Sequence, residues 1–304
     1  MLNPQTPGVR ITGAAMNILT KKLPRRSWLA MLPALLTACS GTDLLNATVS
    51  TDTYRRTADL AYGNNARHRL DVYQPTAGIG KAPMVVFFYG GSWSSGKRGD
   101  YRFVGEALAS RGIVAVVADY RLSPAFRYPA FVEDSASAVR WAFDNAAQFG
   151  ADERRIVVMG HSAGAYNAAM VALDARWLVA VGLNPSRLAG WIGLAGPYDF
   201  LPIIDRQTQV AFNWPDTSPD SQPLVYASKA SPPALLLAPS RDTVVNPQRS
   251  TVAMADRLRR SGVRVESELY DSVSHVTLLA SMAQVLRSRA PVLERVSAFV
   301  QSVG

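Results

Sequence analysis

Apolar residues are grouped in short runs from about residue 66 to the C-terminus, and longer amphipathic stretches separate these runs. A run without polar interruption is typical of a strand that is buried on both faces of a parallel sheet. Such runs lie at residues 84–88, 113–117, 156–159, 191–194 and 234–237. Weaker strand patterns surround residues 70–72 and cover 263–269. The alternation predicts an α/β fold with a mostly parallel central sheet and helices on both faces.

The stretches between the runs predict helices. They cover residues 100–110, 130–149, 162–173, 247–261 and 278–302. Gly112 and Gly150 follow the first two stretches and are typical of helix C-termini. Residues 201–233 contain several prolines and little periodicity, so we expect a small cap or loops beside a functional site, with a solvated connection as the alternative. The pattern gives no indication of a second domain.

The net charge of +9 is concentrated near the N-terminus. Five of the 32 basic residues precede Cys39, and no acidic residue does. The rest of the chain has 27 basic against 23 acidic residues, and so small and scattered an excess does not indicate a nucleic-acid partner. The basic N-terminus therefore points to a targeting segment.

This segment has the order of features found in a signal peptide. Basic residues at 21–26 precede an apolar run at 28–36, which is too short to span a bilayer but suits the apolar core of a signal peptide. Leu-Thr-Ala-Cys at residues 36–39 resembles the bacterial lipobox, in which the cysteine is lipidated and becomes the new N-terminus. We therefore expect residues 1–39 to be a signal peptide that ends at Cys39, the only cysteine, with an ordinary cleavage site as the alternative.

A lipobox predicts an exported protein that is lipid-anchored in the bacterial cell envelope, in the periplasm or at the outer membrane. The residue after the cysteine is Ser40 rather than an aspartate, which points to the outer membrane by resemblance to enterobacterial sorting. The segment at 24–29 also resembles a twin-arginine signal, so both export routes stay open, and Met16 is an alternative start. Residues 40–65 are expected to form a linker to the α/β domain at 66–304.

One short motif joins a predicted strand to a predicted helix. Gly-His-Ser-Ala-Gly at residues 160–164 follows the run at 156–159 and opens an alanine-rich helix. In this context G-x-S-x-G is typical of a nucleophile elbow, a strained turn that exposes a serine hydroxyl above the sheet. Ser162 is therefore the candidate nucleophile. The amide of Ala163, at a helix N-terminus, is a candidate oxyanion donor.

A second glycine-containing segment, Tyr-Gly-Gly-Ser-Trp at residues 89–93, follows the predicted strand at 84–88. A glycine pair allows backbone N–H groups to turn toward a developing oxyanion without interference from side chains. An ordinary tight turn has the same residues, but the combination with the serine motif favours an oxyanion hole. We assign the amides of Gly91 and Ser92 to it.

These motifs resemble those of the hormone-sensitive-lipase-like carboxylesterases and of the carboxylesterase, feruloyl esterase and kynurenine formamidase group of α/β-hydrolases. Those families carry His-Gly-Gly-x-Trp where this chain has Tyr89 before Gly-Gly-Ser-Trp, and their Tyr-Arg-Leu turn matches residues 120–122. Tyr-Pro-Ala at 128–130 and Asp134 match the start of the next helix. The resemblance covers residues 66–304 and implies a catalytic domain of the α/β-hydrolase fold, a serine esterase that acts on a small-molecule ester without a cofactor. Tyr89 in place of histidine leaves the geometry of the loop open.

The acid of the family's catalytic triad follows a buried strand in a Leu-x-His-Gly-x-x-Asp segment. Leu-Ala-Pro-Ser-Arg-Asp at residues 237–242 takes that place, with Pro-Ser instead of His-Gly. Asp242 directly follows an apolar strand at the carboxyl edge of the sheet, where the sites of α/β folds assemble. Its alternative role is to cap the turn before Val244. Asp199, which also follows a predicted strand, is the second candidate for the acid.

The positions of the three histidines in the chain show which of them can be the general base. His68 precedes Ser162, which violates the order serine, acid, histidine of α/β-hydrolases. His161 adjoins the nucleophile and is expected to point away from it. His275, after the last predicted strand, remains as the general base. The predicted catalytic triad is therefore Ser162, Asp242 and His275.

The sequence leaves the substrate open, because a fold does not determine which substrate its site accepts. A carboxylic ester with a short or medium acyl chain is the first interpretation, and an aryl formamide or a peptide-type amide is the second. A non-catalytic ligand-binding lipoprotein is a remote alternative, since such a protein is expected to have lost a triad member. The sequence has no metal-spaced cluster, and the oligomeric state stays open. Aromatic candidates for an apolar substrate pocket are Trp93, Tyr198, Phe200, Phe212 and Trp214.

Overall fold

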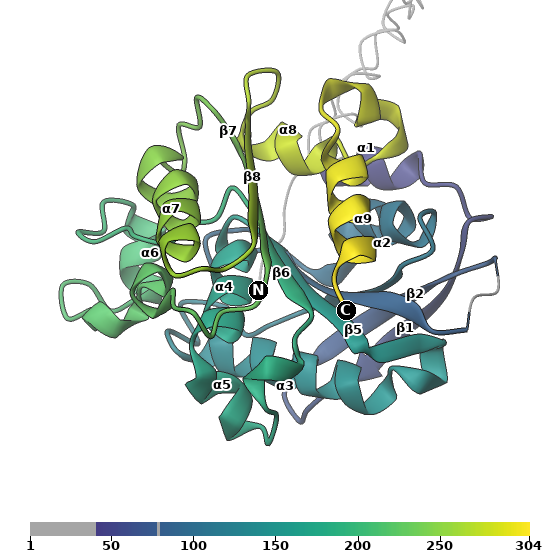
Figure 1. Ribbon diagram of the computed structural model, residues 1–304, viewed down its shortest axis with the longest axis horizontal. Helices are drawn as coiled ribbons and strands as arrows, with labels where there is room; N and C mark the ends of the chain where they lie inside the picture. The colour runs from purple at the N-terminus through teal and green to yellow at the C-terminus, as the bar shows by residue number, and fades with distance from the viewer. Residues whose placement is uncertain (1–40, 78–79) are drawn as a thin grey trace, which may run out of the picture. The chain divides into compact units, whose positions relative to one another are not determined.

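An eight-stranded sheet runs through the computed structural model, which describes residues 41–77 and 80–304 (Figure 1). The strand order is β1-β2-β4-β3-β5-β6-β7-β8. β2 is antiparallel to β1 and to β4, and all other neighbours are parallel. The strands are β1 Tyr54–Ala61, β2 Arg69–Pro75, β3 Ala82–Phe88, β4 Val114–Ala118, β5 Ala151–His161, β6 Gly190–Leu194, β7 Ala234–Pro239 and β8 Val265–Tyr270.

Helices cover both faces of this sheet (Figure 1). α2 and α9 contact each other on one face, and α3 and α4 contact each other on the other. The helices are α1 Gly41–Ala47, α2 Arg102–Ala109, α3 Ala130–Asn145, α4 Ala163–Leu173, α5 Ala175–Ala180, α6 Arg206–Ala211, α7 Ala253–Arg260, α8 His275–Ala280 and α9 Val292–Ser302. Within the described ranges, no helix has the length and apolar character needed to cross a bilayer. The predicted α/β fold is confirmed.

The inner strands are buried on both faces, as their uninterrupted apolar runs predict. Val86 in β3, Val116 in β4 and Leu236 in β7 are all completely buried. The parallel register of β3 and β5 aligns Phe88 with Gly160, and both residues lie at or next to the carboxyl ends of their strands. The glycine-pair segment and the serine motif therefore start at the same edge of the sheet.

The segment expected as a linker carries regular structure instead. Residues 41–61 contain α1 and β1, and β1 pairs with β2 at the edge of the sheet. Arg56 in β1 forms an ion pair of 2.7 Å with the completely buried Asp71 in β2. The linker prediction is wrong here because an edge strand exposes polar and charged side chains and therefore lacks an apolar run.

The helix predicted over residues 278–302 is interrupted. The chain forms α8, a 3-10 helix over Gln284–Arg289 and then α9. Ala290 is extended, with φ −157° and ψ 146°. Pro291 explains the break, because its ring disfavours helical backbone at the preceding residue and it lacks the N–H that a continuing helix needs.

Residues 201–233 form the small cap that the sequence predicts. They contain α6 and two 3-10 helices, Pro219–Ser221 and Pro223–Tyr226. Each 3-10 helix begins at a proline, whose fixed φ suits the first helical position. The stretch before α6 reaches the carboxyl edge of the sheet, where Ile203 and Ile204 line a cavity together with Ser162.

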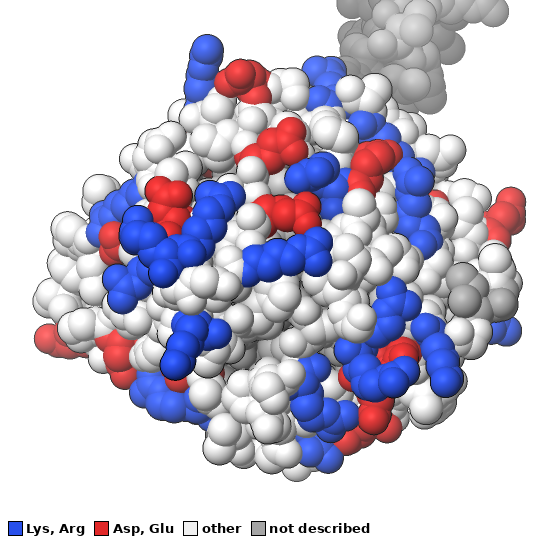
Figure 2. Space-filling model, in the orientation of Figure 1, with Lys and Arg blue, Asp and Glu red and all other residues white. Residues whose placement is uncertain are grey.

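Charges of both signs are mixed on the surface. Figure 2 shows basic and acidic side chains side by side over the face that it presents. Ion pairs of this kind join β8 to α9, where Arg295 contacts Glu266 (3.4 Å) and Glu268 (3.3 Å). A face of mixed charge does not attract a polyanion, so the absence of a nucleic-acid partner stays our prediction.

Candidate active site

Ser162 lies in a sharp turn between β5, which ends at His161, and α4, which begins at Ala163. Its backbone has φ 52° and ψ −121°, a conformation that costs a residue with a side chain on the order of 1–3 kcal/mol. The Ser162 amide donates to the carbonyl of Leu194 in β6 (2.9 Å), which helps to hold the turn. A strained serine between a strand and a helix is the geometry of a nucleophile elbow.

Close backbone contacts require the two glycines of the serine motif. A Cβ atom at Gly160 would overlap the carbonyl group of Gly164, and a Cβ atom at Gly164 would overlap the carbonyl group of Phe88 in β3. Backbone atoms cannot swing aside as the end of a flexible side chain can. The start of α4 therefore lies directly against the end of β3, the strand that leads into residues 89–93.

The structure brings Ser162, His275 and Asp242 together from three segments. His275 Nε2 lies 2.8 Å from Ser162 Oγ, and His275 Nδ1 lies 2.7 Å from Asp242 Oδ2. His275 is the first residue of α8, where the Ser274 side chain caps the helix by accepting the amide of Thr277. The three side chains form one continuous hydrogen-bonded chain, in the order that activation of a serine requires.

Asp242 also caps the turn that follows it, which was its alternative role. Its Oδ1 accepts the amides of Val244 (2.8 Å) and Val245 (3.1 Å), while Oδ2 accepts from His275. Burial alone would raise the pKa of this carboxyl, but the hydrogen bonds from His275 and the two amides outweigh burial, so the pKa lies below its ordinary value. Asp242 is therefore an anion at neutral pH, and the turn fixes its orientation.

The other candidate residues have partners of their own. Asp199, the second candidate for the acid, forms a bidentate ion pair with Arg249 at 2.9 and 3.0 Å. His68 Nε2 lies 2.9 Å from Asp134 Oδ1. Neither contact involves the hydroxyl of Ser162.

The segment 89–93 lies beside Ser162. Ser92 and Trp93 have φ values of 49° and 55°, in the left-handed region that a residue with a side chain rarely adopts, and Gly91 has φ 124°. Ser92 and Ala163 line the same cavity as Ser162. In the part of the chain that the structure describes, neither of their amides donates to a protein acceptor. Both N–H groups are thus available to a bound oxyanion.

Trp93 holds this strained segment against α4. Its Nε1 donates to Asn167 Oδ1 in α4 (3.0 Å). Its ring packs edge-to-face on Phe212 and Tyr166, with centroid distances of 4.8 and 5.2 Å. The Trp93 carbonyl accepts the amide of Ser123 (2.8 Å). Strained backbone persists where the surroundings over-determine it in this way.

Tyr89, which replaces the family's histidine, anchors the segment from its buried side. Its hydroxyl donates to Asp119 Oδ1 (2.8 Å) and accepts from Arg67 Nη2 (2.6 Å). Burial raises the pKa of this hydroxyl well above its ordinary value, so it remains a donor. Arg67 also donates to the carbonyl of Gly96 (2.8 Å). The sequence analysis missed Arg67, because it is distant in sequence from the loop that it contacts.

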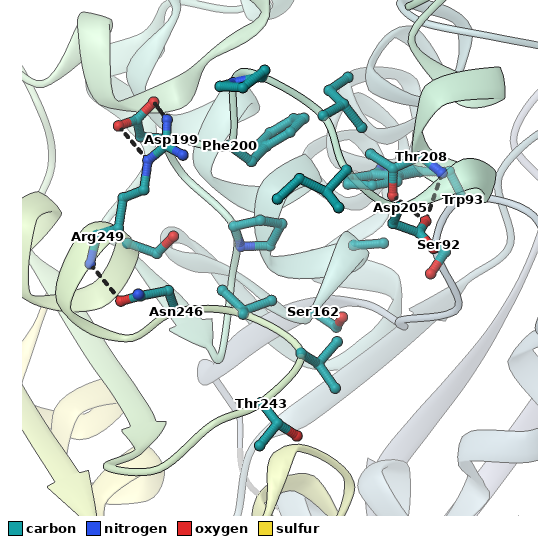
Figure 3. A pocket seen from close by; sticks show the side chains of 18 residues that line it. Ser92, Trp93, Ser162, Asp199, Phe200, Asp205, Thr208, Thr243, Asn246 and Arg249 are labelled. Atoms are coloured by element: carbon teal, nitrogen blue, oxygen red, sulfur yellow. Dashed lines mark hydrogen bonds and ion pairs between the residues drawn. The ribbon is translucent and has the colours of Figure 1, made fainter.

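A cavity of about 590 Å³ includes Ser162 in its lining. Figure 3 shows Trp93 and Thr208 on one side of Ser162, and Arg249 and Asn246 on the other. The larger apolar lining residues are Trp93, Pro197, Phe200, Pro202, Ile203, Ile204, Val244 and Val245. Within the described residues, no group of three or more His, Cys, Asp or Glu side chains is arranged to hold a metal ion.

Three aromatic residues expected in this cavity lie elsewhere. Phe212 is buried and packs edge-to-face on Trp93, outside the cavity lining. Tyr198 is completely buried and packs edge-to-face on Trp191, with the centroids 5.7 Å apart. Trp214 is half-buried against the core and does not contribute to the lining. These three predictions are wrong because an irregular segment has no periodicity to show which way a side chain points. Trp93 and Phe200 do line the cavity.

The strained serine turn, the three linked side chains and the mostly parallel sheet together define a protein of the α/β-hydrolase fold. Comparison with known families then narrows the class. The BD-FAE family model matches residues 70–258, and the chain belongs to this family.

Individual relatives are more distant. A probable isoprenylcysteine alpha-carbonyl methylesterase of Oryza sativa subsp. japonica is 28% identical over 246 residues, which cover 72% of this chain and 56% of the relative. Esterase LipC of Mycobacterium tuberculosis is 29% identical over 223 residues, which cover 66% of this chain and 54% of LipC. The chain thus spans about half the length of the curated relatives it matches. Among solved structures, a Pyrobaculum calidifontis esterase shares the fold, with a TM-score of 0.71, 24% identity and coverage of 86% of this chain and 89% of that one.

Proposed function

We propose that this protein is a serine carboxylesterase that cleaves carboxylic esters with short or medium acyl chains. The observation that carries the proposal is the hydrogen-bonded chain from Ser162 through His275 to Asp242, beside a cavity of about 590 Å³. Two relatives from unrelated organisms are named as a methylesterase and an esterase, which supports the same activity.

The first step is attack of Ser162 Oγ on the carbonyl carbon of the ester. As this bond forms, the hydroxyl proton moves to His275 Nε2, 2.8 Å away. The Asp242 carboxylate accepts the N–H at Nδ1, which leaves Nε2 free to take the proton and stabilises the imidazolium that results.

The negative charge of the tetrahedral intermediate develops on the former carbonyl oxygen. The amides of Gly91, Ser92 and Ala163 donate to this oxyanion, and loss of one such donor typically lowers the rate about 10²- to 10³-fold. When the intermediate collapses, the bond to the alcohol oxygen breaks and the alcohol takes the proton from His275. Water then attacks the acyl-enzyme with His275 as the base, and the acid and free Ser162 are released.

The cavity supports a small ester as the substrate. Its volume falls in the range of roughly 300–1,000 Å³ that is typical of small-molecule sites. The rings of Trp93 and Phe200 suit an apolar acyl chain. Asp199 and Arg249 neutralise each other and present polar atoms, which suits an uncharged polar group of the substrate.

A panel of p-nitrophenyl esters from acetate to dodecanoate, together with aryl formamides, tests this proposal on the purified protein. We expect turnover of the short and medium esters, a fall in kcat/KM once the acyl chain outgrows the cavity, and slower cleavage of the formamides. Cleavage of formamides without cleavage of esters would move the substrate class to amides. No turnover of either class would contradict the proposed activity.

We further propose that the protein is exported and that Cys39 carries its lipid anchor. Cys39 and the signal peptide lie outside the described residues, so the support is the order of basic residues, apolar run and Leu-Thr-Ala-Cys in the sequence. A single acyl chain gives only marginal, reversible membrane binding, so stable anchoring needs a second signal such as a second chain. The anchor would hold the domain at a membrane of the cell envelope.

Cys39→Ala is expected to abolish incorporation of a palmitate analogue, because the chain has no other cysteine to form the thioether. The variant should accumulate as unprocessed precursor or as freely soluble periplasmic protein. Metabolic labelling followed by membrane fractionation measures both effects, with Ser40→Ala as the matched control that keeps its lipid. Undiminished labelling of Cys39→Ala would exclude the lipobox.

A further inference from the structure

His161 connects the nucleophile's segment to the segment of the general base. Its Nε2 lies 2.9 Å from the backbone carbonyl oxygen of His275. A carbonyl oxygen only accepts, so Nε2 carries the proton and donates. The ring thus turns toward the backbone of His275 rather than toward the hydroxyl of Ser162, and the two imidazole centroids are 5.0 Å apart.

The opposite edge of the His161 ring lies against the segment 89–93. A Cβ atom at Gly90 would come within 3.1 Å of His161 Nδ1 and 3.0 Å of the Ser162 Cβ, closer than side chains normally pack. Glycine at this position therefore permits the close approach. The His161 ring therefore lies between Gly90, which directly precedes the predicted oxyanion donors, and the start of α8.

The His161 ring is uncharged in this position. Burial lowers its pKa to about 3, and the neighbouring His275 acts in the same direction. Only 7% of the residue is exposed. A neutral ring adds no positive charge that would oppose protonation of His275 during attack.

We propose that His161 is a positioning residue for the general base, because its hydrogen bond to the His275 carbonyl fixes the start of α8 relative to Ser162. This inference rests on the proposed hydrolase function and adds a residue to it. The bond holds the backbone of His275 and thereby the 2.8 Å distance between Nε2 and Ser162 Oγ. His161 is not part of the cavity lining, so its effect falls on the chemical step and not on substrate binding.

Three substitutions separate the hydrogen bond from the packing of the ring. His161→Gln keeps an N–H donor at about the same reach, His161→Met has a similar length without a donor, and His161→Asn has a donor that is too short. A misplacement of about 1 Å lowers rates by up to about 10²-fold. We therefore expect Met and Asn to reduce kcat and the rate of fluorophosphonate labelling by about 10- to 100-fold with KM within about twofold, and Gln to retain most of the wild-type rate.

Thermal unfolding of each variant checks the fold, and if the Met variant does not fold, the Asn variant decides. Wild-type rates in Met and Asn, equal losses in Met and Gln, or an effect confined to KM would each overturn the role of His161. The labelling rate does not depend on the choice between ester and amide substrates. A wild-type protein that fails to label therefore overturns the proposed function itself, whereas normal labelling of wild type and of all three variants overturns only the positioning role.

Discussion

The Ser162→Ala protein is expected to lose ester hydrolysis by about 10⁴-fold or more while it remains folded, because the hydroxyl that forms the acyl-enzyme is gone. Within the described residues, this hydroxyl hydrogen-bonds only to His275, so its removal leaves the strained turn and its glycines in place. Initial rates with p-nitrophenyl butyrate measure the loss, and circular dichroism with thermal unfolding confirms the fold. Ser186→Ala, at an exposed serine, is the matched control and should keep full activity.

His275→Ala should be nearly as damaging as Ser162→Ala. The double variant should be little worse than either single variant, because the members of a triad act as a unit and their effects are not additive. Near-native hydrolysis of short esters by Ser162→Ala would refute the mechanism. Additive losses in the double variant would mean that the two residues act independently.

Asp242→Asn is expected to lower kcat by about 10⁴-fold. The asparagine still accepts the amides of Val244 and Val245 through its oxygen, so the turn should hold. It no longer offers an anion to His275 Nδ1, and its amide group favours the wrong tautomer of the imidazole. Steady-state kinetics with the same ester measure the change.

Asp199→Asn is the matched control for this substitution, since it makes the same chemical change in a carboxylate near the same cavity. Its carboxylate pairs with Arg249 and not with His275, so we expect a small change in kcat and a moderate change in KM. A larger loss of activity in Asp199→Asn than in Asp242→Asn would mean that Asp199, and not Asp242, is the acid of the triad.

The parallel core of the fold could be predicted from the sequence because strands buried on both faces need uninterrupted apolar runs. The run at 84–88 lies within β3, and the run at 234–237 lies within β7. β1 could not be predicted in this way, because an edge strand has one exposed side and keeps charged residues such as Arg56. The break before α9 has a visible cause in Pro291. The helical pattern over residues 278–302 continues across this proline and therefore predicts a single helix.

Residues of the candidate site are predictable where the chemistry imposes a local pattern. Ser162 is marked by glycines two residues before and after it, which the backbone contacts at the start of α4 require. Contacts between distant segments leave no such pattern, and the bonds from Arg67 to Tyr89 and from His161 to the His275 carbonyl depend on packing that only the structure shows.

Activation of Ser162 by His275 is tested most directly by a fluorophosphonate probe. We expect wild-type protein to gain one covalent adduct per chain, which mass spectrometry should map to Ser162. The adduct should be absent from Ser162→Ala and formed far more slowly by His275→Ala, because the probe reacts with an activated serine. An adduct on a different residue, or unchanged labelling of Ser162→Ala, would contradict the assignment of Ser162 as the nucleophile.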